Sequence, residues 1–262
     1  MIRLSADGVA DRAARIGLAA FGVVHLLIAW LALQLSLGDA SGAASGSGAL
    51  HELAQQPFGK VLVVVVSAGL LLLVVWQLIE VTVGYRDEDG AERLRHRATS
   101  AGKAVLYAGL GWSGVEVARG SGGSGGGTRT WTARLLDLPA GQVLVGLVGL
   151  GVLVVGVVIV RKGVTGDVAD DLDGAGRAGD SGTAYVALGR IGHVAKGVAL
   201  ALVGVLFGYA AVTHEADESG GLDAALREVL DQPFGPVLLS VLAVGLGCYG
   251  LFCLVRAAHL SR

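Results

Sequence analysis

Six long apolar segments, almost free of charged residues, constrain this chain more than any other feature. They lie at about residues 16–37, 60–83, 101–118, 142–160, 191–213 and 236–256. Crossing a hydrocarbon core of about 30 Å takes roughly 20 helical residues. Only helices suit such segments, because lipid offers no partner to unpaired backbone groups. We therefore expect an all-α integral membrane protein with six transmembrane helices. The charged fraction of 16% fits this class, since soluble domains carry about 25%.

The same two-helix unit occurs three times along the chain. Before each even-numbered segment the sequence reads QPFGKVL (56–62), LPAGQVL (138–144) and QPFGPVL (232–238). Two odd-numbered segments also begin alike, as RIGLAAFGVV (15–24) and RIGHVAKGVA (190–199). Proline is tolerated in the first turn of a helix, so we place each proline at the start of an even helix. Each copy begins and ends on the same side, which predicts three tandem hairpin repeats with pseudo-threefold symmetry.

Segment boundaries and charge together give a topology. The division is a cytoplasmic N-terminus (1–14), repeat 1 (15–84), a cytoplasmic linker (85–96), repeat 2 (97–163), an acidic cytoplasmic linker (164–189) and repeat 3 (190–262). Of the 20 lysines and arginines, 15 fall on the side that holds both termini, so that side is cytoplasmic by the positive-inside rule. On the other side, Gly/Ser-rich tracts indicate flexible loops. The spacing of LDAALREVL (222–230), with LHELA (50–54) as its counterpart, predicts a short interfacial helix.

Three motifs mark the copies. They are R-x-G at Arg15–Gly17 and Arg190–Gly192, Q-P-F-G at 56–59 and 232–235, and G-x-x-x-Y-G at Gly245–Gly250 followed by Arg256. This pattern resembles the bacterial family known as domain of unknown function 1206, whose members carry three tandem two-helix membrane repeats. The middle copy departs from it, with Leu138-Pro139-Ala140-Gly141 and no opening R-x-G. The resemblance implies a multi-pass protein of the bacterial cytoplasmic (plasma) membrane and nothing firm about activity.

Polar residues inside apolar segments are candidate functional residues, because burying them in lipid is costly. Gln34, Glu116 and Tyr209 share one repeat position near the outer ends of the odd helices. They could form a polar ring around the axis or belong to an interfacial belt. His25 and Tyr107 share a position nearer the middle of the membrane. His25 could relay protons or simply hydrogen-bond between helices.

A charged network is expected at the inner ends of the helices. Glu80, Lys162 and Arg256 share one repeat position, and Phe21, Lys103 and Lys196 share another. We expect Glu80 to pair with Lys103 or Lys196, in a network of side chains that reach the interface. Small residues at Gly22, Ala104 and Gly197, and at Ala29, Gly111 and Gly204, predict close helix contacts.

The residues give no enzyme signature. The sequence has no Ser/His/Asp grouping, no metal-ligand cluster and no paired carboxylates in one site, so no catalytic residue, metal or cofactor is expected. The acidic linker places Asp171 and Asp173 at EF-hand positions, but the first position is Ala169, which cannot ligate calcium. Cys248 and Cys253 face different ways on a helix.

These observations favour a structural or accessory membrane protein. The alternative is a small-solute or ion transporter with an axial path between the repeats. The expected partners are the lipid bilayer and other membrane proteins or further copies of the chain, with no nucleic acid. A polar, water-accessible axis would separate the two functions, because a structural protein fills its axis with packed side chains.

Overall fold

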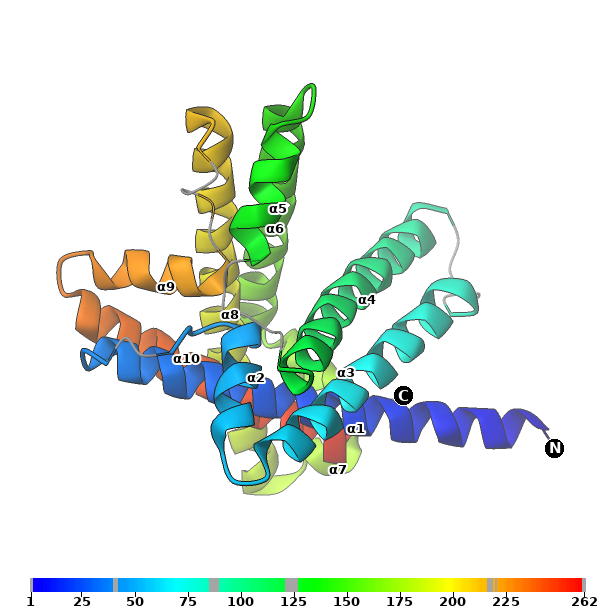
Figure 1. Ribbon diagram of the computed structural model, residues 1–262. Coiled ribbons are helices and arrows are strands. Elements are labelled where there is room, and N and C mark those ends of the chain that lie inside the picture. The colour runs from blue at the N-terminus through cyan, green and yellow to red at the C-terminus, as the bar shows by residue number, and fades with distance from the viewer. Residues whose placement is uncertain are drawn as a thin grey trace.

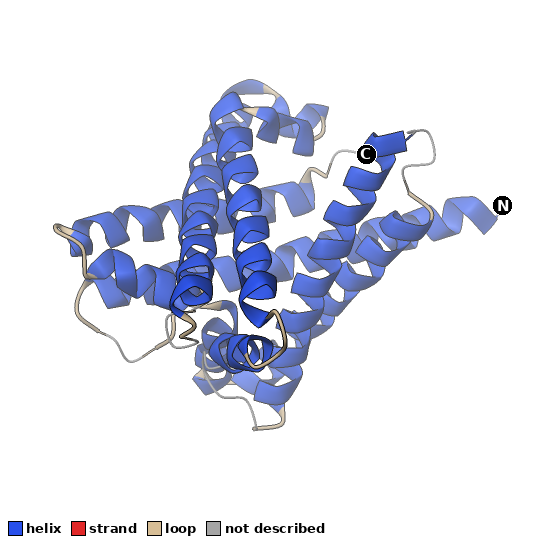
Figure 2. Ribbon diagram, turned by 90° about the horizontal axis from the view of Figure 1, so that it is seen from above, coloured by secondary structure: helices blue, strands red, loops and turns tan. Residues whose placement is uncertain are grey.

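Every described element of the chain is a helix. The computed structural model describes residues 2–39, 42–84, 90–120, 127–215, 219 and 221–260. Its elements are α1 (Ile2–Ser36), α2 (Gly46–Gln55), α3 (Gly59–Thr82), α4 (Gly90–Ala118), α5 (Gly127–Leu136), α6 (Gly141–Thr165), the 3-10 helix η1 (Asp167–Asp171), α7 (Gly174–Arg177), α8 (Gly179–Thr213), α9 (Leu222–Leu230) and α10 (Gly235–Ala258) (Figures 1 and 2). The described residues contain no β-strand, which confirms the all-α class.

Five helices of the described chain are long and apolar enough to cross a membrane. They are α1 from Arg12 onward, α3, α6, α8 and α10. The sixth expected segment, 101–118, lies within α4, where Lys103 and Glu116 make the helix less apolar than the other five. The three odd helices α1, α4 and α8 also begin well before the apolar segments, so polar helical turns extend from their inner ends.

A repeated turn leads into each even helix, and it corrects the expected role of the proline. Pro57 lies two residues before α3, in a turn that the Gly59 N–H closes onto the Gln56 carbonyl at 2.7 Å. Phe58 follows the proline with a left-handed backbone, φ 61°, as the third residue of a type II turn requires. Ala140 and Phe234 repeat this conformation. The proline therefore shapes the preceding turn and does not occupy the first helical turn.

The glycine after this turn is required by close packing. A side chain at Gly59 would collide with the Leu53 carbonyl, at the end of the preceding short helix. Those short helices are α2, α5 and α9, one in each copy. The expected interfacial helix 222–230 is confirmed as α9, and 50–54 lies within α2. Helix α5 was not expected, because it follows a glycine-rich tract.

The long helices form three antiparallel pairs, each joining two different copies. Helix α1 packs on α10, α3 packs on α4, and α6 packs on α8, and the pairs run in different directions past a common centre (Figures 1 and 2). Glycines allow the close contacts that the sequence predicted. A Cβ atom at Gly22 would lie 2.9 Å from the Gly250 carbonyl, and one at Gly197 would lie 2.6 Å from the Gly156 carbonyl. Each copy therefore packs on both of the others, and the three helix pairs close a cycle of copies.

Repeat 2 breaks the symmetry of this cycle. In repeats 1 and 3 the two helices of one copy also pack, α1 on α3 and α8 on α10. There, Gly69 lies against Ala20, and its equivalent Gly245 lies against Ala195. Helices α4 and α6 form no such packed pair among the described residues. A Cβ atom at the equivalent Gly151 would meet no described atom within 4 Å, so the hairpin of repeat 2 is open.

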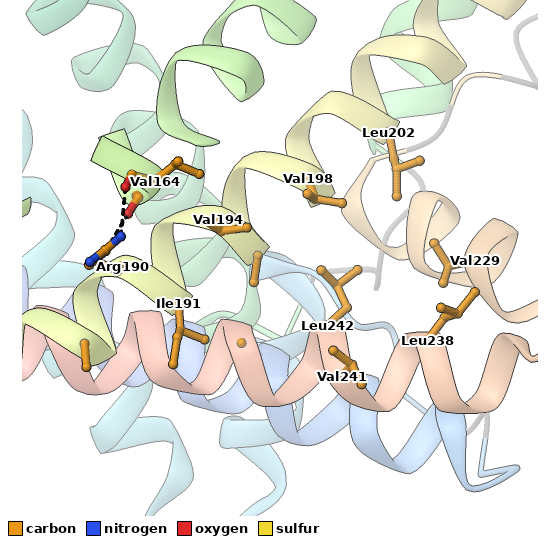
Figure 3. Close-up of a pocket in the computed structure, with 14 residues that line it drawn as sticks. Val164, Arg190, Ile191, Val194, Val198, Leu202, Val229, Leu238, Val241 and Leu242 are labelled. Carbon is orange, nitrogen blue, oxygen red and sulfur yellow. Dashed lines mark hydrogen bonds between the residues drawn. The ribbon is translucent and has the colours of Figure 1, made fainter. Parts of the chain in front are cut away.

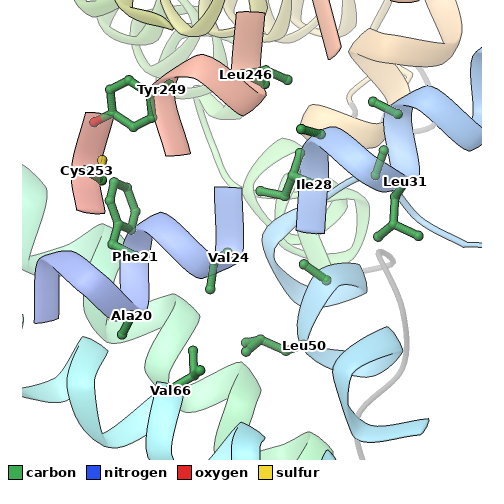
Figure 4. Packing of buried hydrophobic residues seen from close by; sticks show 14 of the residues in the cluster. Ala20, Phe21, Val24, Ile28, Leu31, Leu50, Val66, Leu246, Tyr249 and Cys253 are labelled. Carbon is green, nitrogen blue, oxygen red and sulfur yellow. The ribbon is translucent and has the colours of Figure 1, made fainter. Parts of the chain in front are cut away.

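The main core lies where α1 crosses its neighbours. Figure 4 shows Ala20, Phe21, Val24, Ile28 and Leu31 of α1 against Leu50 of α2, Val66 of α3 and Leu246, Tyr249 and Cys253 of α10. Outside this core, valines and leucines of α3, α6 and α10 are exposed in large numbers. Apolar surface on this scale is typical of contact with a membrane.

Candidate functional site

A lysine held among aromatic rings lies at the centre of the crossing helices. Lys196 of α8 donates a hydrogen bond from Nζ to the Tyr249 hydroxyl of α10 at 2.8 Å. The same nitrogen lies 4.0 Å from the Tyr249 ring centroid and 4.7 Å from that of Phe21 in α1. Aromatic faces attract cations at such distances. Three helices from repeats 1 and 3 therefore share one ammonium group.

His25 and Tyr107 join this cluster through Phe21. The Phe21 ring centroid lies 4.2 Å from that of His25 and 5.0 Å from that of Tyr107. His25 is buried, and its Nδ1 donates to the Phe21 carbonyl at 2.9 Å. His193 of α8 makes the equivalent bond to the Gly189 carbonyl at 2.7 Å. The structure thus brings together two residues that the sequence had placed at one repeat position.

A charged cluster lies at the C-terminal ends of α6 and α10. Asp171, at the end of η1, accepts a 2.7 Å hydrogen bond from Lys162 Nζ and lies 3.3 Å from an Arg256 terminal nitrogen. Lys162 and Arg256 share a repeat position, and both contact the same acid. Burial by itself would raise the pKa of Asp171, but the positive charges of Arg256 and Lys162 outweigh it and hold the pKa below its ordinary value.

The sequence did not predict which acidic residue belongs to this cluster. We expected Glu80 to supply the negative charge, whereas the ion pairs of Lys162 and Arg256 are made by Asp171 from the linker. Glu80 lies within electrostatic range of Lys103, but the described residues show no ion pair between them. The density of aspartates in the acidic linker was the only available signal, and it did not single out Asp171.

The three polar positions expected near the outer ends of the odd helices differ in their exposure. Glu116 and Tyr209 are exposed, Gln34 is half-buried, and Glu116 accepts a 3.2 Å hydrogen bond from the Trp112 ring nitrogen. One helical turn earlier, Trp30, Trp112 and Val205 are each more than half exposed. This placement favours an interfacial belt over a polar ring around the axis.

The R-x-G arginines serve as links between copies. Arg190 donates to the Gly163 and Val164 carbonyls at the end of α6, at 3.2 and 2.9 Å. Arg15, at the same repeat position, donates to the Ala257 and Ala258 carbonyls at the end of α10, at 3.1 and 2.6 Å. Helix C-termini carry unpaired carbonyls and partial negative charge. Each arginine therefore caps the even helix of the neighbouring copy.

An apolar groove of about 840 Å³ runs beside Arg190 (Figure 3). It lies between α8 and α10, and α9 contributes Val229 at its far end from Arg190. Its lining is almost wholly aliphatic, with Val194, Val198 and Leu242 among the residues that face it. Such a surface suits a lipid acyl chain.

The linker aspartates are engaged in contacts within the protein. Asp173 accepts a 2.7 Å hydrogen bond from the Gly176 N–H, which lowers the pKa of its carboxyl, and lies 3.3 Å from His259 Nδ1. The described residues contain no group of three or more His, Cys, Asp or Glu side chains placed to hold a metal ion.

Taken together, the helices define a protein of three related two-helix repeats, with several helices apolar enough for a multi-pass membrane protein. A family model described as Domain of Unknown Function (DUF1206) matches three times, over residues 16–84, 98–166 and 191–259. The chain belongs to this family, which confirms the resemblance seen in the sequence. It is also similar to "Uncharacterized protein YxxB" of Bacillus subtilis (strain 168), with 30% identity over 249 residues, 95% of this chain and 90% of that protein. No solved structure matches the chain.

Proposed function

We propose that this chain is a structural or accessory component of the bacterial cytoplasmic membrane, with six spans and both termini in the cytoplasm. The sixth span is α4, which pairs with α3. The excess of lysine and arginine on the side of the termini supports their cytoplasmic location. The protein is not an enzyme in this proposal, and its partners are lipids and other membrane proteins or further copies of the chain.

The observation that carries this proposal is the closed centre of the helix cycle. Phe21, His25, Tyr107 and Tyr249 pack ring against ring where the helices cross, with centroids 4.2 to 5.0 Å apart for the closest pairs. Rings at these separations are in direct contact, which supports a centre filled by packed side chains. A core of this kind stabilises an assembly, and the exposed aliphatic faces and the groove beside α8 suit lipid contact.

A transporter is the second candidate, and Lys196 is the observation in its favour. A lysine inside a membrane helix is costly and commonly marks a path for ions or solutes. His25 and His193 lie beside the same tyrosine, with ring centroids 4.8 and 5.1 Å from that of Tyr249. Two imidazoles and an ammonium group around one phenol could bind or pass a proton.

Water access to the centre separates the two functions. Single cysteines would be placed at positions 25 and 107 in a chain without Cys248 and Cys253, and treated with a membrane-impermeant thiol reagent. We expect labelling at an exposed control position, 37, and none at 25 or 107. Labelling at both central positions from outside would establish a hydrated path and make the transporter the better proposal.

A further inference from the structure

The charged cluster contains more positive than negative side chains. Its cations are Lys103, Lys162 and Arg256, and the carboxylates among them are Asp171 and Glu80. Charge left uncompensated at the edge of a membrane is costly and usually finds a counterion. Two negative groups for three positive ones leave the cluster short of an anion.

Two hydrogen-bond donors of the cluster have no acceptor in the described part of the chain. The Nε atom of Arg256 is buried without a hydrogen-bond partner, although a terminal nitrogen of the same side chain reaches Asp171. Lys103 forms no ion pair with a described carboxylate. A buried donor without an acceptor costs free energy, so both groups favour a ligand that supplies oxygen atoms.

The open hairpin of repeat 2 leaves the Lys103 end of the cluster accessible. Phe21 and Lys196 share the repeat position of Lys103, and Phe21 is buried and Lys196 half-buried, whereas Lys103 is exposed. Next to it, a side chain at Gly102 would meet nothing within 4 Å. Helix α6, which carries Lys162, diverges from α4 (Figure 1). The equivalent helices α1 and α8 are covered by α3 and α10 on this side, whereas α4 is uncovered there.

We propose that Lys103, Lys162 and Arg256 bind a phosphate group at this open side of repeat 2. Ammonium groups attract phosphate as point charges, and a guanidinium donates two or more hydrogen bonds to it. The phosphate belongs to the headgroup of an anionic phospholipid or to a free phosphate ion. The cluster lies at the inner ends of the helices, where anionic headgroups of the cytoplasmic leaflet are available. This assigns a ligand to a protein whose proposed role is structural.

The test is the binding of fluorescent phosphatidylglycerol to the full chain in neutral detergent micelles. We expect saturable binding that Lys103→Gln weakens about tenfold, as the loss of one charge-assisted hydrogen bond predicts. Lys103→Arg should keep most of the affinity. Lys60→Gln, which removes an exposed lysine at the other end of α3 from the cluster, should change nothing. If Lys103→Gln unfolds, as seen by circular dichroism, Lys162→Gln takes its place.

Competition identifies the source of the phosphate. Displacement by inorganic phosphate would support the proposal with a free ion as ligand, and displacement by unlabelled phosphatidylglycerol alone would support it with a lipid as ligand. Wild-type affinity in the folded Lys→Gln variant, Lys103→Gln or its replacement Lys162→Gln, would overturn the proposal. Equal displacement by zwitterionic phosphatidylcholine would also overturn it, because the cluster would then make no use of its excess charge.

Discussion

At the scale of single residues, Asp171 holds two copies of the repeat together. Its carboxylate contacts Lys162 of repeat 2 and Arg256 of repeat 3, and the positive charges lower its pKa. A group whose pKa is lower in the folded protein stabilises it fully above the ordinary carboxyl pKa of about 3.9, and this stabilisation is lost as the pH falls through the lowered value. The contribution of Asp171 is therefore complete at neutral pH and disappears in acid.

Replacing Asp171 by asparagine should expose this pH dependence. We expect the variant to lose about 1–2 kcal/mol of stability at pH 7, between the values for surface and buried ion pairs. Thermal unfolding in detergent from pH 7 to pH 2 should show the difference between the two proteins shrinking below about pH 3.9. The exposed Asp167 of the same linker is the matched control. A constant difference at all pH values would rule out the ion pairs as its cause.

Gly197 should tolerate no large side chain. It lies against the Gly156 backbone, where a Cβ would already come within 2.6 Å of a carbonyl oxygen. Gly197→Leu is expected to lower the stability by about 1–3 kcal/mol through overpacking, measured as a lower Tm in detergent. Gly102→Leu is the control, because its Cβ would face open space. Equal loss in both variants would show that close packing at Gly197 is not its cause.

At the scale of elements, the arginines of the R-x-G motif join the C-terminal end of one helix to an interior turn of another. Arg15→Ala should free the Ala257 and Ala258 carbonyls of α10 and cost about 1 kcal/mol of stability, the net value of one or two hydrogen bonds. Arg12→Ala, one turn earlier and exposed, should be neutral. The Tm values of both variants are measured in the same detergent, and equal values would show that the cap adds nothing to stability.

At the scale of the whole molecule, the cycle of pairs predicts which helices can be cross-linked. In a chain without Cys248 and Cys253, cysteines at Ala29 and Gly247 should form a disulfide on mild oxidation, because the Cβ atoms at these positions of α1 and α10 lie 3.6 Å apart. The pair at Gly146 and Ala211, which joins α6 to α8 with Cβ atoms 3.7 Å apart, should behave alike. A faster-migrating band on a non-reducing gel is the measurement.

A third pair of cysteines tests the open hairpin. Gly102 and Gly151 are the repeat 2 equivalents of Ala20 and Gly69, which pack together in repeat 1. In repeat 2, both positions face open space. Cysteines there should remain reduced under conditions that oxidise the other two pairs. Efficient cross-linking at these positions would show that repeat 2 closes as the other two repeats do.

The sequence by itself determined the class of the protein and its repeats. Lipid requires long helices without charge, so apolar length alone predicted α1, α3, α6, α8 and α10, and small residues predicted where backbones touch. Sequence spacing could also place His25 and Tyr107 at one repeat position, because three similar copies must fold in similar ways.

Only the tertiary structure decided which copies pair, which hairpin opens and which acid completes the charged cluster. These depend on contacts between residues far apart in the chain, such as Lys196 with Phe21 and Arg15 with Ala258. Asp171 could not be chosen among the linker aspartates, because a flexible, charged segment fixes no partner until it folds against the helix ends. Three similar repeats predict a symmetric arrangement. Only the tertiary packing shows that the two helices of repeat 2, α4 and α6, do not pack on each other as those of repeats 1 and 3 do.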